Sequence, residues 1–328
     1  MNVVMIIPTG VGCEIGGHAG DATPVAKLLG KCCDKLILHP NVVNASNINE
    51  MPENSLYVEG SILDQFLIGV IELEEVRNNK ILVAVNCVEP EIVNTVSAAR
   101  TTLGVDIEIV ELDIRLEMEG VIQADGSAWG YYSGVSNLIR QFKDKSFDAL
   151  AVVTDIKVSA GTKAVYLDGG GGVNPWGKVE SMVSREIASA LRKPVAHAPA
   201  VDNEPVRNIL DPRKAAEFIS STFCYCIFKG LQKAPRIGKG LSVSDVEAVI
   251  LPFNVWNDIY SSCRKRYPSV KFIIVKENKT CFRDFPYPDP HGLIFVENYW
   301  EAAGVLSCFK AGIQPESVRR PLSETIYT

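Results

Sequence analysis

Two histidines stand where the chain leaves short predicted strands, and their side chains could carry proton-transfer chemistry. His39 follows the apolar run 35–38, and His197 follows the run 194–196. Imidazole titrates near neutral pH and serves as a general acid or base. Ligands of open α/β sheets bind at the carboxyl ends of parallel strands. We therefore predict that His39 and His197 are catalytic and act as a two-base pair across one substrate.

The chain between the first predicted strand and the first predicted helix is rich in glycine. Such loops expose backbone N–H groups at a helix N-terminus, which favours binding of a carboxylate or a phosphate. The spacing is not G-x-G-x-x-G and no P-loop lysine follows, so we predict no nucleotide cofactor. The expected substrate site combines these glycines with nearby polar residues: Gly10, Gly12, Gly16, Gly17, Asp21, Asn41, Asn44 and Asn203.

Segments 16–44 and 172–203 share one order of features. Each has glycines, a proline near the first helical turn, an apolar helix, a short strand, a histidine, a proline and an asparagine. An internal duplication explains this likeness, and so does the general similarity of βαβ units.

The sequence also allows two other kinds of site, a cysteine nucleophile and a metal site. Cys13 could be a nucleophile with His18 or His39 as its base, although most cysteines pack as small hydrophobic residues. His39 and His197 could bind a metal together with Asp155 or Asp202, but no H-x-x-x-H or H-E-x-x-H spacing supports this. We therefore predict no metal.

Short β-branched runs alternate with segments of helical periodicity, which predicts an α/β fold. We expect mostly parallel, Rossmann-like sheets with helices on both faces and two or more βαβ sub-domains. The predicted units are 1–145, 146–235 with a Gly-rich loop at 168–172, and 241–328, which could share a compact domain with the others. The predicted strands are 3–7, 35–38, 81–85, 107–112, 112–118, 149–153, 194–196, 248–251, 271–275 and 293–296, and the helices include 179–191, 257–266 and 299–310.

The composition limits the partners of the protein. The 328 residues are 47% hydrophobic and 22% charged, with a net charge of −6. Without a basic stripe the chain is not expected to bind nucleic acid. It contains no apolar run of about 20 residues, so we expect no membrane partner. The nine cysteines include an adjacent pair, which indicates reduced thiols and a cytoplasmic location. A homo-oligomer is the default expectation.

Several stretches together resemble the family catalogued as domain of unknown function 3326. They are IIPTGVG, GGHAGDATPVAKLL, HPNVVN, LYVEGSILDQF, GGVNPWGKVESMVSREI, PVAHAPA and IIVKENKT, in matching order over most of the chain. The resemblance implies no known activity, but it implies that these positions form one shared site. Cys13 and His18 look like variable positions of the family. Glu277 and Asn278 follow the strand 271–275, which adds them to the expected substrate site.

We therefore expect an enzyme that acts on a small anionic metabolite by histidine acid–base chemistry. An isomerase or racemase is the first expectation, and a lyase or hydrolase follows. One alternative is a metabolite- or nucleotide-binding regulatory module without catalysis. Another alternative is a metal-dependent hydrolase.

Overall fold

The two ends of the chain meet in one parallel sheet. The computed structural model describes residues 1–168, 172–199, 209–219, 223–282, 287, 289–322 and 324–325. Its largest sheet has six strands, and all neighbouring pairs are parallel. The central strands are rich in Val, Ile and Leu because both faces of the sheet are buried. The order is β14 (Leu293–Val296), β13 (Lys271–Val275), β12 (Val246–Pro252), β1 (Asn2–Met5), β2 (Lys35–Leu38) and β3 (Ser55–Tyr57).

The middle of the chain forms a second parallel sheet of four strands. Its order is β10 (Val195–Pro199), β9 (Ala149–Thr154), β5 (Ile81–Val85) and β6 (Ile107–Glu111). Each of the two hydrophobic clusters of the core takes residues from both sheets. The predicted α/β class with parallel sheets is confirmed.

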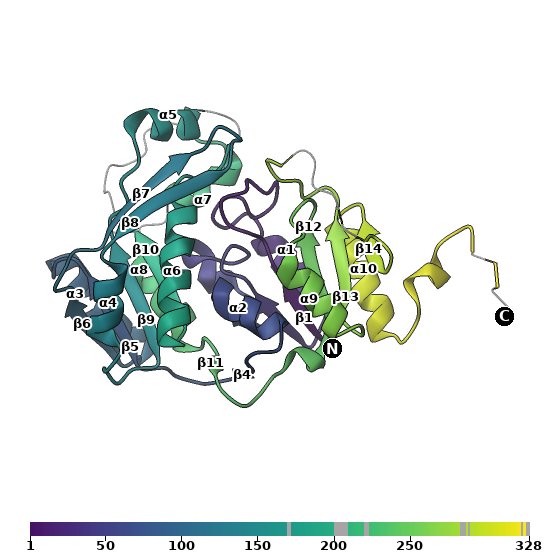
Figure 1. The fold of residues 1–328 in the computed structure, drawn as a ribbon, viewed down its shortest axis with the longest axis horizontal. Helices are drawn as coiled ribbons and strands as arrows, with labels where there is room; N and C mark the ends of the chain where they lie inside the picture. Colours follow the sequence, from purple (N-terminus) through teal and green to yellow (C-terminus); the bar gives the residue numbers. More distant parts are fainter. Residues whose placement is uncertain are drawn as a thin grey trace.

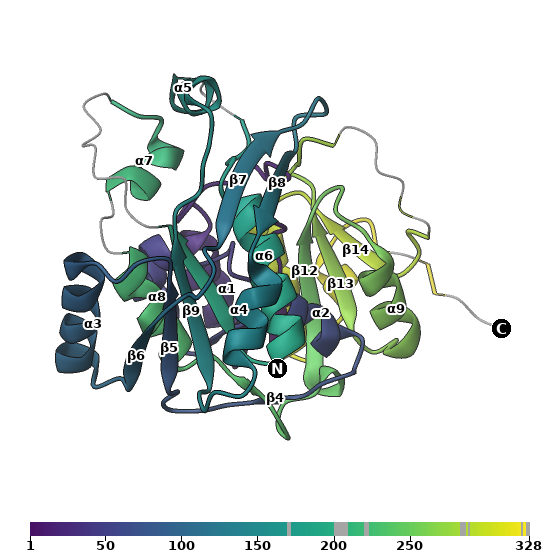
Figure 2. The same cartoon turned by 60° about the vertical axis from the view of Figure 1, so that its left-hand side comes forward.

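The longest helix, α6 (Gly177–Leu191), lies between the two sheets (Figures 1 and 2). Its apolar stripe includes the buried residues Val179, Val183 and Ile187. On its other side Arg185 pairs with Asp64 at 2.7 Å. The remaining helices are α1 (Thr23–Cys32), α2 (Gly60–Leu67), α3 (Pro90–Leu103), α4 (Val135–Phe142), α5 (Ala160–Asp168), α7 (Pro212–Ile219), α8 (Phe223–Gln232), α9 (Asp258–Arg266) and α10 (Tyr299–Lys310), with short 3₁₀ turns at Ala45–Glu50, Val243–Asp245 and Pro315–Val318.

An antiparallel hairpin that the sequence did not predict packs on α6. It consists of β7 (Glu117–Ile122) and β8 (Ala128–Ser133), and it rises above the N-terminal end of α6 (Figures 1 and 2). A Cβ atom at Gly130 would lie 2.3 Å from the Cβ of Val179, so this glycine lets the hairpin pack closely on the helix. The predicted strand 112–118 is wrong, because the chain bends at 112–116 and the strand begins only at Glu117.

The two sheets group segments that are far apart in the sequence. Strands before residue 60 pair with strands after residue 245, while 81–111 pair with 149–199. The sheets therefore cross the predicted boundaries near 145 and 235–241, and the division into three units stays a prediction. The connector contains β11 (Arg236–Ile237), which pairs antiparallel with β4 (Leu73–Glu74). Residues 169–171 of the predicted Gly-rich loop lie outside the described residues.

Candidate active site

A hydrogen-bonded chain of three side chains connects the four-stranded sheet to α6. Thr154 is the last residue of β9, and its hydroxyl lies 3.1 Å from Nε2 of His197. Nδ1 of His197 lies 3.2 Å from Oε1 of Glu180, on the first turn of α6. Because the carboxylate can only accept, the bonding pattern assigns the ring proton to Nδ1 and makes Nε2 the acceptor for Thr154.

In this hydrogen-bonded chain, the carboxylate of Glu180 is accessible to solvent and the imidazole of His197 is not. Thr154 and the side chain of His197 are 1% exposed, whereas the side chain of Glu180 is 26% exposed. The predicted position of His197 is wrong, because His197 is the third residue of β10 and not a strand exit. The carboxyl-end rule could have found Thr154, since it directly follows the predicted strand 149–153, but no spacing indicated Glu180.

A second chain of polar side chains comes from the loop after β1, from α5 and from α7. Nδ1 of His18 lies 2.7 Å from the hydroxyl of Tyr166. Tyr166 in turn donates to Oε2 of Glu217 at 3.0 Å, and Asn174 donates to the other carboxyl oxygen. The sequence did not indicate Tyr166 or Glu217, because they lie on separate helices with no motif of their own. His18, a candidate base for Cys13 in the sequence, bonds Tyr166 instead.

Burial sets the protonation of this second chain. Desolvation raises the pKa of Glu217 to about 7, and the negative charge of Glu180 adds to the rise. Burial also lowers the pKa of His18 to about 4, with the cations of Arg213 and Lys214 acting in the same direction. Near neutral pH, His18 is therefore neutral, while Glu217 is partly protonated and partly ionised.

Glu180 lies close to both sheets. Its charge adds to the burial that raises the pKa of Tyr57, the last residue of β3, and it also acts on Glu217. His197, its hydrogen-bond partner, belongs to the other sheet. The first turn of α6 is thus the point at which the predicted βαβ segments meet.

His39 lies just beyond the end of β2, as predicted, but in a different setting from His197. Its Nδ1 accepts from the backbone N–H of Asn41 at 3.2 Å, so Nε2 carries the proton of the neutral ring. A Cβ at Gly60 would lie 3.0 Å from that Nε2. Burial lowers the pKa of His39 to about 4, and the charge of Arg185 contributes. His39 is therefore a neutral hydrogen-bond donor near pH 7.

The side chain of Asn41 also fixes the loop after β1, since it donates to the carbonyl of Pro8 at 3.3 Å. In this loop Gly10 and Gly12 have φ of +80° and +61°. A Cβ at Gly10 would meet the side chain of Lys178 at 2.9 Å, so the glycine brings its backbone against α6. The ammonium group of Lys178 lies 5.7 Å from the centre of the Trp129 ring. Burial lowers the pKa of Lys178, and the charge of Arg185 adds to this.

The later part of the glycine loop is engaged with other protein groups. The N–H of Gly16 donates to Asp21 at 2.5 Å, and a Cβ at Gly17 would overlap the carbonyl of Cys13. Asp21 also accepts from Arg213 at 3.3 Å, and burial raises the pKa of Asp21 to about 6. Through these contacts Gly16, Gly17 and Asp21 shape the loop itself.

Glu277 and Asn278 form hydrogen bonds with residues that are distant in the sequence. Glu277 accepts from the N–H of Tyr299 at 3.1 Å at the start of α10. Asn278 is fully buried, exchanges hydrogen bonds with the N–H and carbonyl of Ile15, and donates to the hydroxyl of Tyr299 at 2.7 Å. Asn44 is half-buried before the first 3₁₀ turn, and Asn203 lies outside the described residues. These contacts are structural, and the substrate-orienting role of Glu277 and Asn278 stays a prediction.

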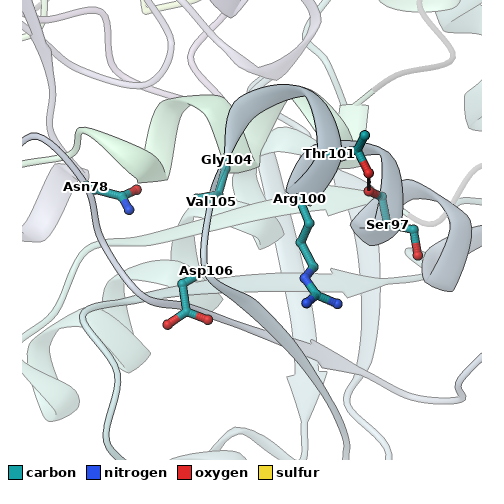
Figure 3. A pocket seen from close by; sticks show the side chains of 7 residues that line it. All are labelled: Asn78, Ser97, Arg100, Thr101, Gly104, Val105 and Asp106. Carbon is teal, nitrogen blue, oxygen red and sulfur yellow. Dashed lines mark hydrogen bonds between the residues drawn. The ribbon is translucent and has the colours of Figure 1, made fainter.

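A hollow of about 610 Å³ lies elsewhere, between the end of α3 and the start of β6 (Figure 3). Arg100 and Asp106 extend from its wall in Figure 3, and both are exposed. This hollow lies at the amino end of β6, whereas parallel sheets bind ligands at carboxyl ends. We therefore place the candidate site at the first turn of α6.

The described part of the chain offers neither a metal cluster nor a membrane span. No group of three or more His, Cys, Asp or Glu residues there could hold a metal ion. Within the same residues, no helix has both the length and the apolar character needed to span a bilayer. All nine cysteines belong to this part of the chain, and none of them forms a disulfide.

The fold and the two polar chains define an α/β protein with a titratable site between two parallel sheets. The chain belongs to the family described as protein of unknown function (DUF3326), whose model matches residues 2–319, so the resemblance in the sequence is confirmed. It is 32% identical over 339 residues to an "uncharacterized lipoprotein" of Synechococcus sp. (strain ATCC 27144 / PCC 6301 / SAUG 1402/1), covering 96% of this chain and 92% of that protein. No solved structure matches the chain.

Proposed function

We propose that this protein is a small-molecule enzyme of the isomerase, racemase or lyase type, and that Glu180 is its general base. The chain Thr154–His197–Glu180 carries the proposal. It fixes one partly exposed carboxylate through two buried groups, at the carboxyl end of β9 and between two sheets. A carboxylate held in one orientation suits proton abstraction from carbon.

The histidines take a different role in this proposal from the one first expected. A general acid or base works best with a pKa near the operating pH, and His39 has a pKa of about 4. His197 is buried behind Glu180 and orients it, which makes His197 a positioning residue. His39 contributes a neutral N–H donor on the side of the six-stranded sheet.

An anionic substrate fits the charges near this turn. Lys178 on the same turn of α6 has no salt bridge among the described residues, and it lies against the backbone of Gly10. A carboxylate bound to the ammonium group of Lys178 would lie at the same turn of α6 as Glu180. The favoured substrate is therefore a small carboxylic or phosphorylated acid with an acidic C–H bond.

Deuterium exchange tests the proposal. The protein is incubated in D₂O with a panel of small 2-amino, 2-hydroxy and phosphorylated acids, and loss of the C–H signal is followed by ¹H NMR. We expect exchange with at least one compound, and a loss of about 10²-fold or more in Glu180→Gln, because general-base catalysis contributes that much. Glu186→Gln is the matched control, since Glu186 lies on the same helix but bonds Tyr132.

The outcomes separate the alternatives. Exchange that survives in Glu180→Gln would remove Glu180 as the base. Compounds that bind the wild-type protein without exchange would instead support a binding module.

A hydrolase is the second candidate, because hydroxyl, imidazole and carboxylate follow the order of a nucleophile–base–acid triad. Thr154 would then attack the substrate, whereas in the first proposal it only supports His197. Thr154→Val should abolish turnover and labelling by an acylating probe if the hydroxyl is the nucleophile. The near-complete burial of Thr154 favours the first proposal.

We also propose a cytoplasmic location, which the absence of disulfides among the nine cysteines supports. The name of the Synechococcus relative suggests attachment by a lipid instead. Fractionation of the host cell separates the two, since recovery of the protein in the membrane fraction would contradict a cytoplasmic location.

A further inference from the structure

We propose that Glu217 is a second acid–base residue of this site, which delivers a proton to the substrate while Glu180 removes one. The inference rests on the proposed function and deepens it. Tyr166 and His18 act behind Glu217 as positioning residues. The two carboxyl groups thereby form an acid and a base, each supported by a hydroxyl and a histidine.

The carboxyl group of Glu217 is held at both oxygens. Tyr166 donates to Oε2 and Asn174 to Oε1, and the backbone N–H of Ala19 adds a third bond. Tyr166 is itself fixed by His18 and by an edge-on contact with Trp176, whose ring centre lies 5.6 Å away. Such support holds a group in one orientation for chemistry.

The two cations on the same helix as Glu217 are engaged by other groups. Arg213 bonds Asp21, Glu14 and the carbonyl of Cys13. Lys214 donates to the carbonyl of Tyr166 and lies over its ring. No salt bridge joins Glu217 to a cation among the described residues. Asn174 links Glu217 to the start of α6, because its side chain donates to Oε1 of Glu217 and accepts from the backbone N–H groups of Trp176 and Gly177. The charge of Glu180, on the first turn of α6, adds to the rise in the pKa of Glu217.

The two carboxyl groups lie in different surroundings. Glu180 accepts from His197 and is partly exposed, so it is suited to take a proton. Glu217 is desolvated and faces a like charge, so it is suited to hold one. Environments that separate two carboxyl groups in this way are how acid and base roles are divided in enzymes.

The proposed proton transfer needs no co-reactant. Glu180 takes the proton of the C–H bond next to the substrate carboxylate, and the electron pair of that bond forms an enediolate. Glu217 then donates its proton to the same carbon from the opposite side, and the enediolate electrons form the new C–H bond. Both carboxyl groups return to their starting states by proton exchange with water.

A titration of the protein alone tests the pairing of Glu180 and Glu217. With ¹³C-labelled glutamate, one carboxyl resonance that disappears in Glu217→Gln should titrate near pH 7. Glu180→Gln should lower that pKa, because it removes the like charge. Glu186→Gln should leave it unchanged. A resonance of Glu217 that titrates below pH 5, or that does not respond to Glu180→Gln, would overturn the proposal.

The same titration distinguishes a positioning role of Tyr166 from a merely structural one. Tyr166→Phe removes the hydroxyl that bonds the carboxylate form, so it should raise the pKa of Glu217. Tyr132→Phe is a matched control, because Tyr132 makes the same kind of bond to Glu186 at 2.8 Å. An unchanged pKa in Tyr166→Phe would remove Tyr166 from this role.

Activity then separates this inference from the proposed function. With any substrate found by deuterium exchange, Glu217→Gln should keep the exchange at Glu180 but lose net interconversion by about 10²-fold or more. Equal loss of both would contradict separate acid and base roles. If the wild-type protein exchanges no compound, the proposed function fails, whereas the titration still decides whether Glu217 is coupled to Glu180.

Discussion

Replacing Asn278 with alanine is expected to lower the free energy of unfolding by about 4 kcal/mol, since three buried hydrogen bonds are lost at once. The side chain is fully buried and bonds the N–H and the carbonyl of Ile15 and the hydroxyl of Tyr299. Alanine would leave these groups buried without partners. Urea unfolding followed by circular dichroism measures the loss.

Asn257→Ala provides the comparison for this experiment. Asn257 is the exposed N-cap of α9, where its side chain accepts from Ile259 and Tyr260, so its loss should cost about 1 kcal/mol. A destabilisation by Asn278→Ala no larger than that of Asn257→Ala would contradict the structural role. If Asn278→Ala stays stable but loses deuterium exchange, Asn278 orients the substrate, as the sequence predicted.

Gly130→Ala is expected to destabilise the protein by about 3 kcal/mol, because overpacking of a fixed contact is costly. The new Cβ would lie 2.3 Å from the Cβ of Val179, which is fully buried on α6. Neither atom can move without shifting the hairpin or the helix. Since Val179 precedes Glu180, we also expect the variant to reduce deuterium exchange.

The hairpin offers its own control at Gly126. This residue lies at the tip with a φ of +84°, and a Cβ added there would meet no atom within 4 Å. Gly126→Ala should therefore cost about 1 kcal/mol from backbone strain alone. Thermal unfolding of both variants gives the comparison. Equal effects at the two positions would show that contact with α6 does not limit the packing of the hairpin.

The sequence predicted most strands of the two parallel sheets. The strands Lys35–Leu38, Ile81–Val85, Lys271–Val275 and Leu293–Val296 and the helix Tyr299–Lys310 match their predicted bounds. These elements are local runs whose apolar pattern reflects burial directly. The β7–β8 hairpin was missed, although Asp125-Gly126 between two alternating runs is a strong hairpin signal.

The candidate site was only partly predictable. The carboxyl-end rule directed attention to the end of β2 and would apply equally to Thr154, but it misplaced His197, which lies within β10. It could not rank His39 against His197, nor show that His197 supports Glu180. The pKa of a histidine depends on burial and on charges such as that of Arg185, which local sequence does not specify.

The amino-acid sequence by itself determined the α/β class, the family and most of the strands, because periodicity and composition act over a few residues. Only the tertiary structure decided that β1 pairs with β12, that His197 bonds Glu180 and that Tyr166 and Asn174 bond Glu217. Such contacts join segments that are distant along the chain, and they depend on how helices and sheets pack rather than on spacing. The two glutamates became candidates for chemistry only once these partners had been placed.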